Sequence, residues 1–404
     1  MSVINNKTQA KNWPRVRLGG VATLITKGTT PTTVGGKFTD KGINFIKVES
    51  IAEDGHFIFN KFDHIDESTN KLLKRSVIKE DDILYSIAGA IGRVALVTKK
   101  ELPANINQAL AIIRLNPEKV YPKYLFYALS TRFQKIFANN LVAQSVQANI
   151  NLKQVGDLEI NLPEIKEQKK ITDILSAFDN KIELNNKINQ NLEQTTQAIF
   201  KKWFGNNKLG DKNGKLNDLM DIISGFPFSS KIYNPTKGFG VVTIKNVQDG
   251  NFVREFDSFI KNEDLPKKIN KNCILEDGDI LLSLTGNVGR VCIVYGGKYL
   301  LNQRVAKIKS KNEKDLPFCY FLLRQVAMRN ILINMAKGSA QPNLSPIETG
   351  EIEFAVPSRD LLDDFSKIAT PIYHKIIKGI NENQKLASLR DSLLSKLMSG
   401  EIRV

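Results

Sequence analysis

The chain has 404 residues, too many for a single hydrophobic core, and a usual domain size of about 150 residues predicts two or three domains. Its 58 Lys and Arg against 42 Asp and Glu give a formal net charge of +16, which is typical of proteins that bind a polyanion such as nucleic acid or an anionic membrane. No apolar run reaches the roughly 18 residues of a membrane helix, and residues 1–17 lack the apolar segment of a signal peptide, so we expect a cytoplasmic protein.

Motifs that carry chemistry are missing from the sequence. Cys273, Cys292 and Cys319 stand far apart, without a C-x-x-C or Cys/His cluster, so we predict neither a disulfide framework nor a zinc site, and each cysteine is expected to be a small buried hydrophobic residue. There is no G-x-x-x-x-G-K-[ST] nucleotide loop and no Asn- or Asp-Pro-Pro-aromatic box of an amino-methyltransferase. We therefore expect a protein without catalytic residues, a metal or a cofactor.

The first part of the chain is predicted to be a mixed α and β globule. Short apolar runs separated by glycine turns predict strands, and one longer apolar run predicts a helix. In chain order these elements are an apolar segment at 18–25, a turn at Gly28, strand-and-turn segments at 46–48 and 54–57, a glycine-bearing segment at 82–94, the dipeptide Asn107-Gln108, and a helical stretch at 124–137.

The second part repeats the first. The segment DILYSIAGAIGRV at 82–94 returns as DILLSLTGNVGRV at 279–291, which is 197 residues later. This period is far longer than the roughly 20–50 residues of solenoid and propeller repeats, so it predicts a duplicated domain of about 150–160 residues. The other matching elements are the apolar segment at 216–223, the turn at Gly225, segments 244–246 and 249–252, the dipeptide Asn302-Gln303, and a helical stretch at 318–335.

A long helix with a coiled-coil pattern is predicted after each globule. Residues 164–204 contain no proline or glycine, and their apolar positions keep a 4-3 alternation that the second half repeats at an offset of 194. Both patterns are polar at the centre. The predicted seam residues are Ile171, Leu175, Phe178, Ile182, Asn185, Asn189, Leu192, Thr196, Ile199 and Trp203 in the first helix, and Phe365, Ala369, Ile372, Ile376, Gly379, Asn383, Leu386, Arg390, Leu393 and Leu397 in the second.

We expect the two helices to pack on each other. About 40 residues at about 1.5 Å each span about 60 Å, more than a globule of this size requires, although two amphipathic helices that each pack on their own domain are an alternative. Association about a pseudo-twofold axis makes the pair antiparallel. Pro371 is expected to kink the second helix or to mark its first turn. An axis near Lys187 and Asn381 pairs Asn185 with Asn383, Asn189 with Gly379, Ile182 with Leu386, and Ile171 with Leu397.

Motifs at the ends of these helices resemble a known family. LPEIKEQKKI at 162–171 is similar to the L-P-x-x-x-E-Q-x-x-I start of a helix in the specificity subunits of type I restriction-modification systems. LRDSLL at 389–394, followed by SGEIR at 399–403, resembles the end of the family's C-terminal helix. With S-x-x-G-x-x-G and Asn-Gln in both halves, the resemblance covers nearly the whole chain. The second helix departs from the pattern, because VPSRD at 356–360 lacks the Glu-Gln pair.

The resemblance implies an α+β chain with two tandem mixed α/β target recognition domains, separated by two long helices packed as an antiparallel coiled coil with pseudo-twofold symmetry. Its implied boundaries are recognition domains at 1–163 and 207–357 and conserved helices at 164–206 and 358–404. Each domain would read one half of a bipartite double-stranded DNA target. The helices would set the spacer and dock two modification (methyltransferase) subunits, and restriction subunits would complete the complex. A duplicated nucleic-acid-binding protein that acts without methyltransferase partners is the alternative.

Candidate DNA contacts follow from the chemistry of base reading, in which Arg and Lys suit guanine, Asn and Gln suit adenine, and phosphates accept any basic or amide group. Residues shared by the two copies should bind phosphate or stabilise the domain, and positions that differ should read sequence. For the polar residues just before the helices, turn formation is an equal alternative. The candidates are Lys47, Ser86, Arg93, Gln108, Ser145, Gln147, Asn149, Lys245, Ser283, Thr285, Asn287, Arg290, Gln303, Arg304, Gln341 and Asn343.

Overall fold

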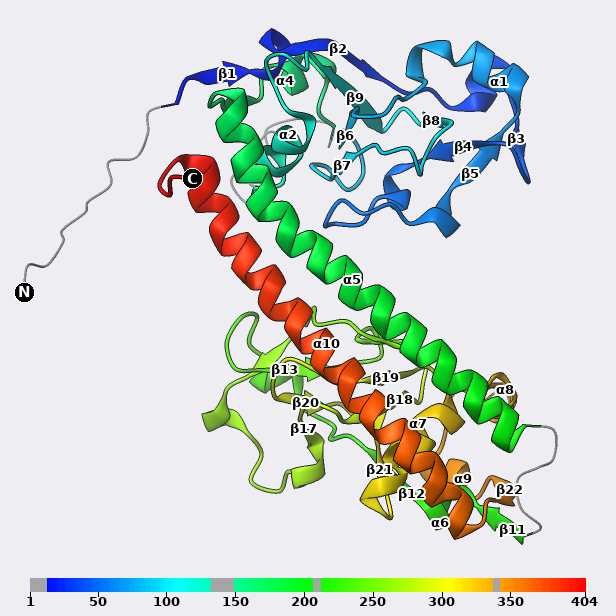
Figure 1. The fold of residues 1–404 in the computed structure, drawn as a ribbon. Coiled ribbons are helices and arrows are strands. Elements are labelled where there is room, and N and C mark those ends of the chain that lie inside the picture. Colours follow the sequence, from blue (N-terminus) through cyan, green and yellow to red (C-terminus); the bar gives the residue numbers. More distant parts are fainter. Residues whose placement is uncertain (1–12, 132–148, 206–211, 337–341) are drawn as a thin grey trace, which may run out of the picture. The chain divides into compact units, whose positions relative to one another are not determined.

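The computed structural model describes residues 13–131, 149–205, 212–336 and 342–404 (Figure 1). The chain forms two compact units, residues 1–180 with 387–404, and residues 181–386. Each unit therefore contains one globular domain together with a stretch of both long helices. The implied boundaries after residues 163 and 357 fall next to the first residues of these helices, Ile165 and Arg359.

The domain of the first unit contains two four-stranded sheets. One is antiparallel with the order β2-β9-β6-β7, and the other is mixed with the order β3-β5-β4-β8, in which β4 and β8 are parallel. The strands are β1 Arg15–Arg17, β2 Ala22–Lys27, β3 Phe38–Thr39, β4 Ile43–Ile46, β5 Asp63–Ile65, β6 Ile83–Ser86, β7 Val94–Leu96, β8 Ala104–Ile106, β9 Leu110–Leu115 and β10 Glu159–Asn161. The helices are α1 Glu67–Leu72, α2 Pro122–Leu129, α4 Leu152–Gly156 and the first part of α5 Ile165–Phe204.

The domain of the second unit has the same plan. Its antiparallel sheet has the order β12-β21-β18-β19, and its mixed sheet has the order β16-β13-β20-β17 with β13 and β20 parallel. The strands are β11 Lys212–Lys215, β12 Met220–Ser224, β13 Phe239–Val242, β14 Val247–Gln248, β15 Asn251–Phe252, β16 Phe259–Ile260, β17 Ile274–Leu275, β18 Ile280–Ser283, β19 Val291–Ile293, β20 Tyr299–Leu301, β21 Val305–Ser310 and β22 Glu353–Val356. The helices are α6 Leu216–Leu219, α7 Leu316–Leu323, α8 Val326–Ala336, α9 Pro346–Gly350 and α10 Arg359–Ser399.

The matching strand orders confirm a duplicated α+β domain. The central strands β6 and β18 are buried along their whole length because both faces of each are covered. Cys273, Cys292 and Cys319 are buried free thiols, as predicted, and burial raises the pKa of Cys319 to about 12. The stretch predicted as one helix at 318–335 is two helices, with a break at Arg324 and Gln325 between α7 and α8. Of the matching stretch in the first domain, α2 ends at Leu129 and residues 132–137 lie outside the described part.

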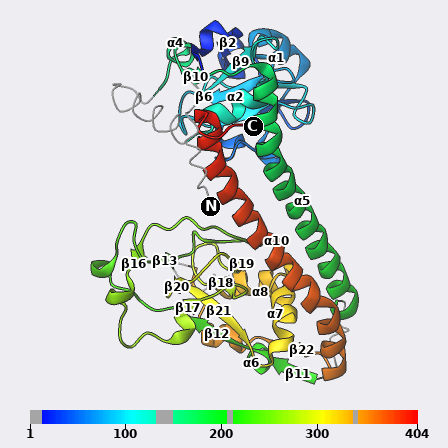
Figure 2. The same cartoon turned by 60° about the vertical axis from the view of Figure 1, so that its left-hand side comes forward.

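Within the first unit, α5 and α10 run side by side (Figures 1 and 2), and their contacts are antiparallel. Ile171 and Leu175 near the start of α5 lie in one hydrophobic cluster with Leu394 and Leu397 near the end of α10. Farther along, Arg390 Nη1 donates to Asp179 Oδ1 at 2.6 Å, so residue numbers rise on one helix as they fall on the other. This arrangement agrees with the predicted pairing of Ile171 with Leu397.

Within the second unit, the same direction is fixed by polar contacts. Asn185 Nδ2 donates to Asn383 Oδ1 at 2.9 Å, which confirms the predicted pairing at the polar centre. A Cβ atom at Gly379 would lie 2.7 Å from Asn189 Oδ1, so glycine allows the close approach at the second predicted pair. Every predicted seam residue is buried or partly buried.

Pro371 does not mark the start of the second helix. It lies inside α10, which begins at Arg359, so that part of the prediction is wrong. The side chain of Pro371 is exposed, and the missing N–H leaves one carbonyl of the preceding turn without its helical donor.

Replacing both seam asparagines, Asn185→Leu with Asn383→Leu, is expected to raise the free energy of unfolding by about 1 kcal/mol, because an apolar pair replaces a polar one in a buried seam. Asn383→Leu alone should lower it by about 1 kcal/mol, because the Asn185 amide then loses one of its two acceptors and keeps only Glu382 Oε2, at 3.1 Å. Chemical denaturation of the wild-type protein, the double variant and the single variant tests whether the free energy of unfolding rises in the double variant and falls in the single one. A double variant less stable than the single one would contradict the seam contact.

Candidate nucleic-acid interface

Four separate segments of the first domain meet at one end of the β2-β9-β6-β7 sheet. Ile87 N donates to Ala109 O and Ile150 N donates to Ile87 O, both at 2.8 Å, so the turns after β6 and β8 lie beside the segment at 149–150. Gly28 N donates to Leu110 O at 3.2 Å and brings in the end of β2. The structure thus gathers the predicted residues Gln108 and Asn149, both exposed, on one surface.

The second domain gathers the equivalent segments in the same way. Leu284 N donates to Arg304 O at 3.1 Å, and Leu344 N donates to Leu284 O at 2.8 Å. Phe226, after β12, donates its N–H to Leu301 O at 2.9 Å. Backbone bridges join Thr285 to Asn343 here, as they join Ala88 to Asn149 in the first domain. The predicted residues that this surface exposes are Asn287, Gln303, Arg304 and Asn343.

The repeated S-x-x-G-x-x-G motif is a closed turn between two strands. Ser86 Oγ donates to Ala90 O at 2.5 Å and accepts from Arg93 N at 2.7 Å. Ser283 makes the same two contacts, with Asn287 O and Arg290 N. The glycines take left-handed backbone angles, with φ of 71° at Gly89, 82° at Gly92, 67° at Gly286 and 78° at Gly289, which other residues rarely adopt.

This turn corrects two of the predicted DNA contacts. Ser86 and Ser283 are fully buried, and their hydroxyls are used within the turn. A serine in this position cannot reach a base edge, so the prediction that Ser86 and Ser283 bind DNA is wrong. They shape the loop whose exposed residues, at 89–90 and 286–287, remain candidates.

The shared arginines are occupied within their own domains. Arg93 Nη1 donates to Ile51 O at 2.6 Å, tying the turn to the loop after β4. Arg290 Nη1 donates to Gln248 Oε1, the side chain at the matching place in the second domain. Of the two roles predicted for the shared residues, these contacts favour stabilisation of the domain.

The shared lysines are also paired. Lys47 Nζ lies 2.8 Å from an Asp63 carboxylate oxygen, and the hydrogen bond to Asp63 raises the pKa of Lys47. Lys245 Nζ lies 2.6 Å from an Asp257 carboxylate oxygen, just before β16. Lys245 is well exposed, so its pair is screened by water and leaves the ammonium accessible.

The remaining predicted residues divide into two groups. Thr285 is partly buried, and its Oγ1 has no hydrogen-bond partner among the described residues, whereas its counterpart in the first copy, Ala88, has no hydroxyl. Ser145, Gln147 and Gln341 lie outside the described residues.

Thr30 is a residue of this surface that the sequence analysis missed. Its hydroxyl donates a hydrogen bond to Gln108 Oε1, and the predicted turn at Gly28 was the sequence signal that could have placed it there.

The start of α5 is tied to its domain by Gln168, the second residue of the Glu-Gln pair. Gln168 is fully buried, accepts from Tyr121 N at 2.8 Å and donates to Pro163 O at 2.8 Å. The second helix, which lacks the pair, uses Arg359 instead. Arg359 donates two hydrogen bonds, at 2.6 and 2.7 Å, to the buried carboxylate of Asp315. The departure of the second helix from the motif therefore changes the chemistry of its anchor.

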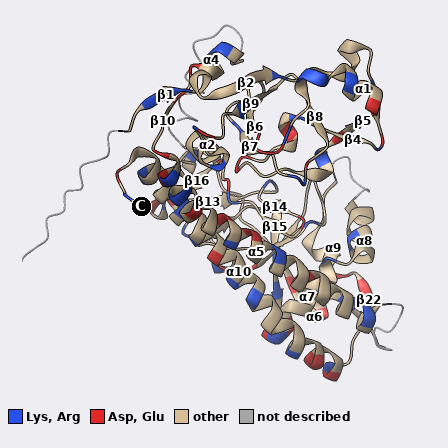
Figure 3. Ribbon diagram, turned by 45° about the horizontal axis from the view of Figure 1, so that its top comes forward, with Lys and Arg blue, Asp and Glu red and all other residues tan. Residues whose placement is uncertain are grey.

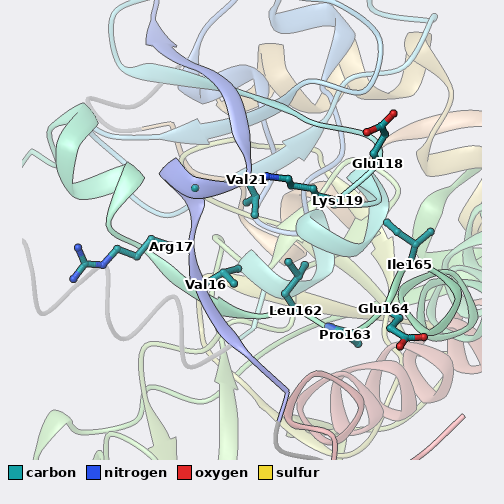
Figure 4. A pocket seen from close by; sticks show the side chains of 10 residues that line it. Val16, Arg17, Val21, Glu118, Lys119, Leu162, Pro163, Glu164 and Ile165 are labelled. Atoms are coloured by element: carbon teal, nitrogen blue, oxygen red, sulfur yellow. The ribbon is translucent and has the colours of Figure 1, made fainter.

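A cavity of about 540 Å³ lies beside the start of α5 (Figure 4). Its apolar lining includes Val16, Val21, Leu162 and Ile165, from β1, the following turn and the segment that leads into α5. Charged side chains, among them Arg17 and Glu164, also contribute to the lining. This hollow makes the start of α5 an uneven surface of mixed apolar and charged character.

The charge excess lies mainly outside the long helices. Each of them carries seven Lys or Arg and five Asp or Glu, and Figure 3 shows both signs along α10. Since the whole chain carries +16, most of the excess belongs to the globular domains and the segments that join them. This distribution places the positive charge on the parts that contain the candidate surfaces.

Neither a metal site nor a membrane span is found in the described part of the chain. No three His, Cys, Asp or Glu side chains there are placed to hold a metal ion. None of the helices described combines the length and apolar character that a bilayer crossing requires.

A duplicated α+β domain with equivalent polar surfaces, joined to an antiparallel helix pair, defines the class of protein to which this chain belongs. The sequence profile of the family described as type I restriction modification DNA specificity domain matches residues 10–194 and 210–382. The chain therefore belongs to this family and contains two copies of its domain.

Individual specificity subunits are similar to this chain over most of its length. The type I restriction enzyme HindI specificity subunit of Haemophilus influenzae is 28% identical, with 86% of this chain and 93% of that protein covered. The MjaIX specificity subunit of Methanocaldococcus jannaschii is 26% identical, with 98% and 94% covered. The crystal structure of a type I restriction-modification S subunit from M. genitalium, 19% identical, has the same fold, with a TM-score of 0.55 over 98% of both chains.

Proposed function

We propose that this specificity subunit reads a bipartite double-stranded DNA target, one half with each recognition domain, and that the helix pair sets the spacer between the halves. The observation that carries the proposal is that the same four segments converge at one end of the same sheet in both domains. The framework of the two surfaces is shared, through Ser86 and Ser283 and their glycine turns. The exposed side chains on that framework differ, as two different half-sites require.

Two of the differing segments are the turns after β6 and β18 and the turns after β8 and β20. Where the first domain has Ala90 and Ala109, the second has Asn287 and Arg304. An exposed Asn suits adenine and an exposed Arg suits guanine, since each can make two hydrogen bonds to one base edge. The second domain therefore carries more groups for direct base reading on these turns than the first.

The outer surfaces of α5 and α10 are the proposed docking sites of two modification subunits. Several large apolar side chains on these helices are exposed to solvent. Exposed apolar surface commonly marks a contact with another protein, which supports this assignment. These side chains are Ile174, Leu184 and Ile188 on α5, and Ile368 and Leu389 on α10. In the proposed complex, which acts on DNA in the cytoplasm, modification and restriction subunits supply methylation and cleavage, and this chain supplies the sequence specificity.

The substitution Arg304→Ala is expected to weaken binding to one half-site by about tenfold to 100-fold and to leave the other half-site unchanged, because one good arginine contact to a base contributes about 1–3 kcal/mol of discrimination. Lys309→Ala, also exposed and near the other end of β21, is the control. Affinities for duplexes in which either half-site is scrambled measure the effect. Equal losses on both halves would contradict the division of labour.

Purification of the tagged chain from cells that also express the modification subunits tests the docking part. A stable complex that methylates the bipartite target, with no methyl transfer by the isolated chain, is the expected result. A chain that binds its target tightly but never associates with a methyltransferase would favour the stand-alone DNA-binding alternative.

A further inference from the structure

One face of α10 carries a row of residues that contact the second recognition domain. The row consists of Tyr373, Ile377, Asn381 and Gln384, whose spacings of four, four and three residues place them on one side of a helix. It runs beside the seam positions Ile372, Ile376, Gly379 and Asn383. We call it the α10 contact row.

The turn between β17 and β18 packs on the first three members. Tyr373 is buried and donates its hydroxyl to Gly278 O at 2.7 Å. A Cβ atom at Gly278 would lie 3.5 Å from Ile377 Cδ1, so the backbone of this turn passes close to the helix. Asn381 Nδ2 donates to Asp277 Oδ2 at 2.9 Å, and the other oxygen of Asp277 accepts from Gly297 N at 3.0 Å.

The turn between β19 and β20 packs on the last member. The Gln384 amide lies against the Arg254 guanidinium, and with its oxygen turned toward the guanidinium it accepts from Nη2 at 2.9 Å. Arg254 is itself held by Tyr299, whose hydroxyl accepts from Nε at 2.7 Å, and by Gly296 O at 3.2 Å. Gly296 has a φ of 82°, a backbone conformation that favours glycine, and its backbone lies close to the Gln384 amide.

This set of contacts differs from what the first domain carries at the same places. In the aligned repeat Arg254 corresponds to Phe59, which is 50% exposed. The loop of the first domain that matches 295–298 closes on itself, because Thr98 N and Thr98 Oγ1 both donate to Glu101 Oε2 at 2.7 Å. At these two places the first domain therefore has no counterpart of the contacts that Arg254 and the 295–298 loop make with α10.

We propose that the α10 contact row is a positioning element that fixes the second recognition domain on the helix pair and thereby sets how strictly the protein selects spacer length. This inference rests on the proposed function. Apolar packing is not directional, whereas Asn381 adds a directional hydrogen bond to Asp277 and Gln384 adds one to Arg254. A fixed tilt restricts the DNA spacing at which both half-sites are engaged at once.

The DNA target is first identified from the positions that the complex with modification subunits methylates. Binding of this complex is then measured to duplexes with the natural spacer and to duplexes with spacers one or two base pairs longer or shorter. Asn381→Asp places a second carboxylate against Asp277 with almost no change in shape. We expect the preference for the natural spacer over its neighbours to fall about tenfold, from loss of one hydrogen bond and addition of a like-charge contact.

The double variant Asn381→Asp with Asp277→Asn should restore the preference to within about twofold. The amide introduced at position 277 can donate to the carboxylate introduced at position 381, while the amide oxygen still accepts from Gly297 N. Ser388→Asp adds the same charge at an exposed position of the same helix and should have no effect. Melting temperatures of all variants separate a change of positioning from a loss of folding.

An Asn381→Asp complex that keeps the wild-type spacer preference, or a double variant that fails to restore it, would overturn the positioning role and leave the proposed function intact. A wild-type complex that binds all spacers equally would overturn both.

Discussion

Replacing Phe365 by alanine is expected to lower the free energy of unfolding by about 3–5 kcal/mol. Phe365 is fully buried. Its ring lies 5.2 Å from Phe204 and 5.5 Å from Phe200, both of α5, and 6.1 Å from Phe318 of α7. Deleting the ring leaves a cavity among side chains of three helices that cannot all close on it.

Chemical denaturation measures this loss. Ile368→Ala, one turn farther along α10 where the side chain is 38% exposed, is the matched control and should change stability by no more than about 0.5 kcal/mol. If Phe365→Ala cost as little as Ile368→Ala, the ring cluster would not be what holds α5, α7 and α10 together.

The second large effect is expected from Arg114→Ala, at about 3–5 kcal/mol, because it leaves a buried carboxylate without its counter-ion. Asp82 is only 1% exposed, and Arg114 donates to both of its oxygens, at 2.7 and 2.6 Å. The N–H of Lys79 would then be its one remaining donor among the described contacts. In the second domain the matching Asp279 pairs with Lys307 at 2.8 Å, which shows that both copies place a cation against this shared aspartate.

Arg114→Lys is the control, since it keeps the charge and loses the two-pronged geometry, and it should recover part of the stability. Chemical denaturation of the wild-type, Arg114→Ala and Arg114→Lys proteins measures the free energy of unfolding of each. Equal stability of the alanine and wild-type proteins would mean that Asp82 finds other partners when Arg114 is removed.

The repeat and the helix register were predictable because they rest on patterns of residue type. Asn185 and Asn383 interrupt apolar seams at equivalent places, so a pseudo-twofold pairing brings them together, and the structure does so. The mixed α and β character of each domain was also predictable from short apolar segments whose order is the same in both copies, but the division of the strands into two sheets was not.

Hydrogen-bond partners that come together only through tertiary packing were not predictable from the sequence. A serine in a glycine-rich turn looks the same in sequence whether its hydroxyl faces solvent or, like Ser86 and Ser283, closes the turn from inside. Gln168 was visible as part of a motif, but its backbone partners at Tyr121 and Pro163 come from the packing of α5 on the domain. The break between α7 and α8 falls at Arg324 and Gln325, where no proline or glycine marks the end of a helix in the sequence.

The proposed function requires that two domains on one chain read two halves of one DNA target at a fixed separation. Long-read sequencing of N6-methyladenine in DNA from cells that express this chain with its modification subunits tests it most directly. The expected result is a motif of two short half-sites with a single spacer length and one methylated adenine on each strand, in which Arg304→Ala relaxes only one half. A continuous motif, or a methylation pattern that does not change when this chain is removed, would contradict the claim.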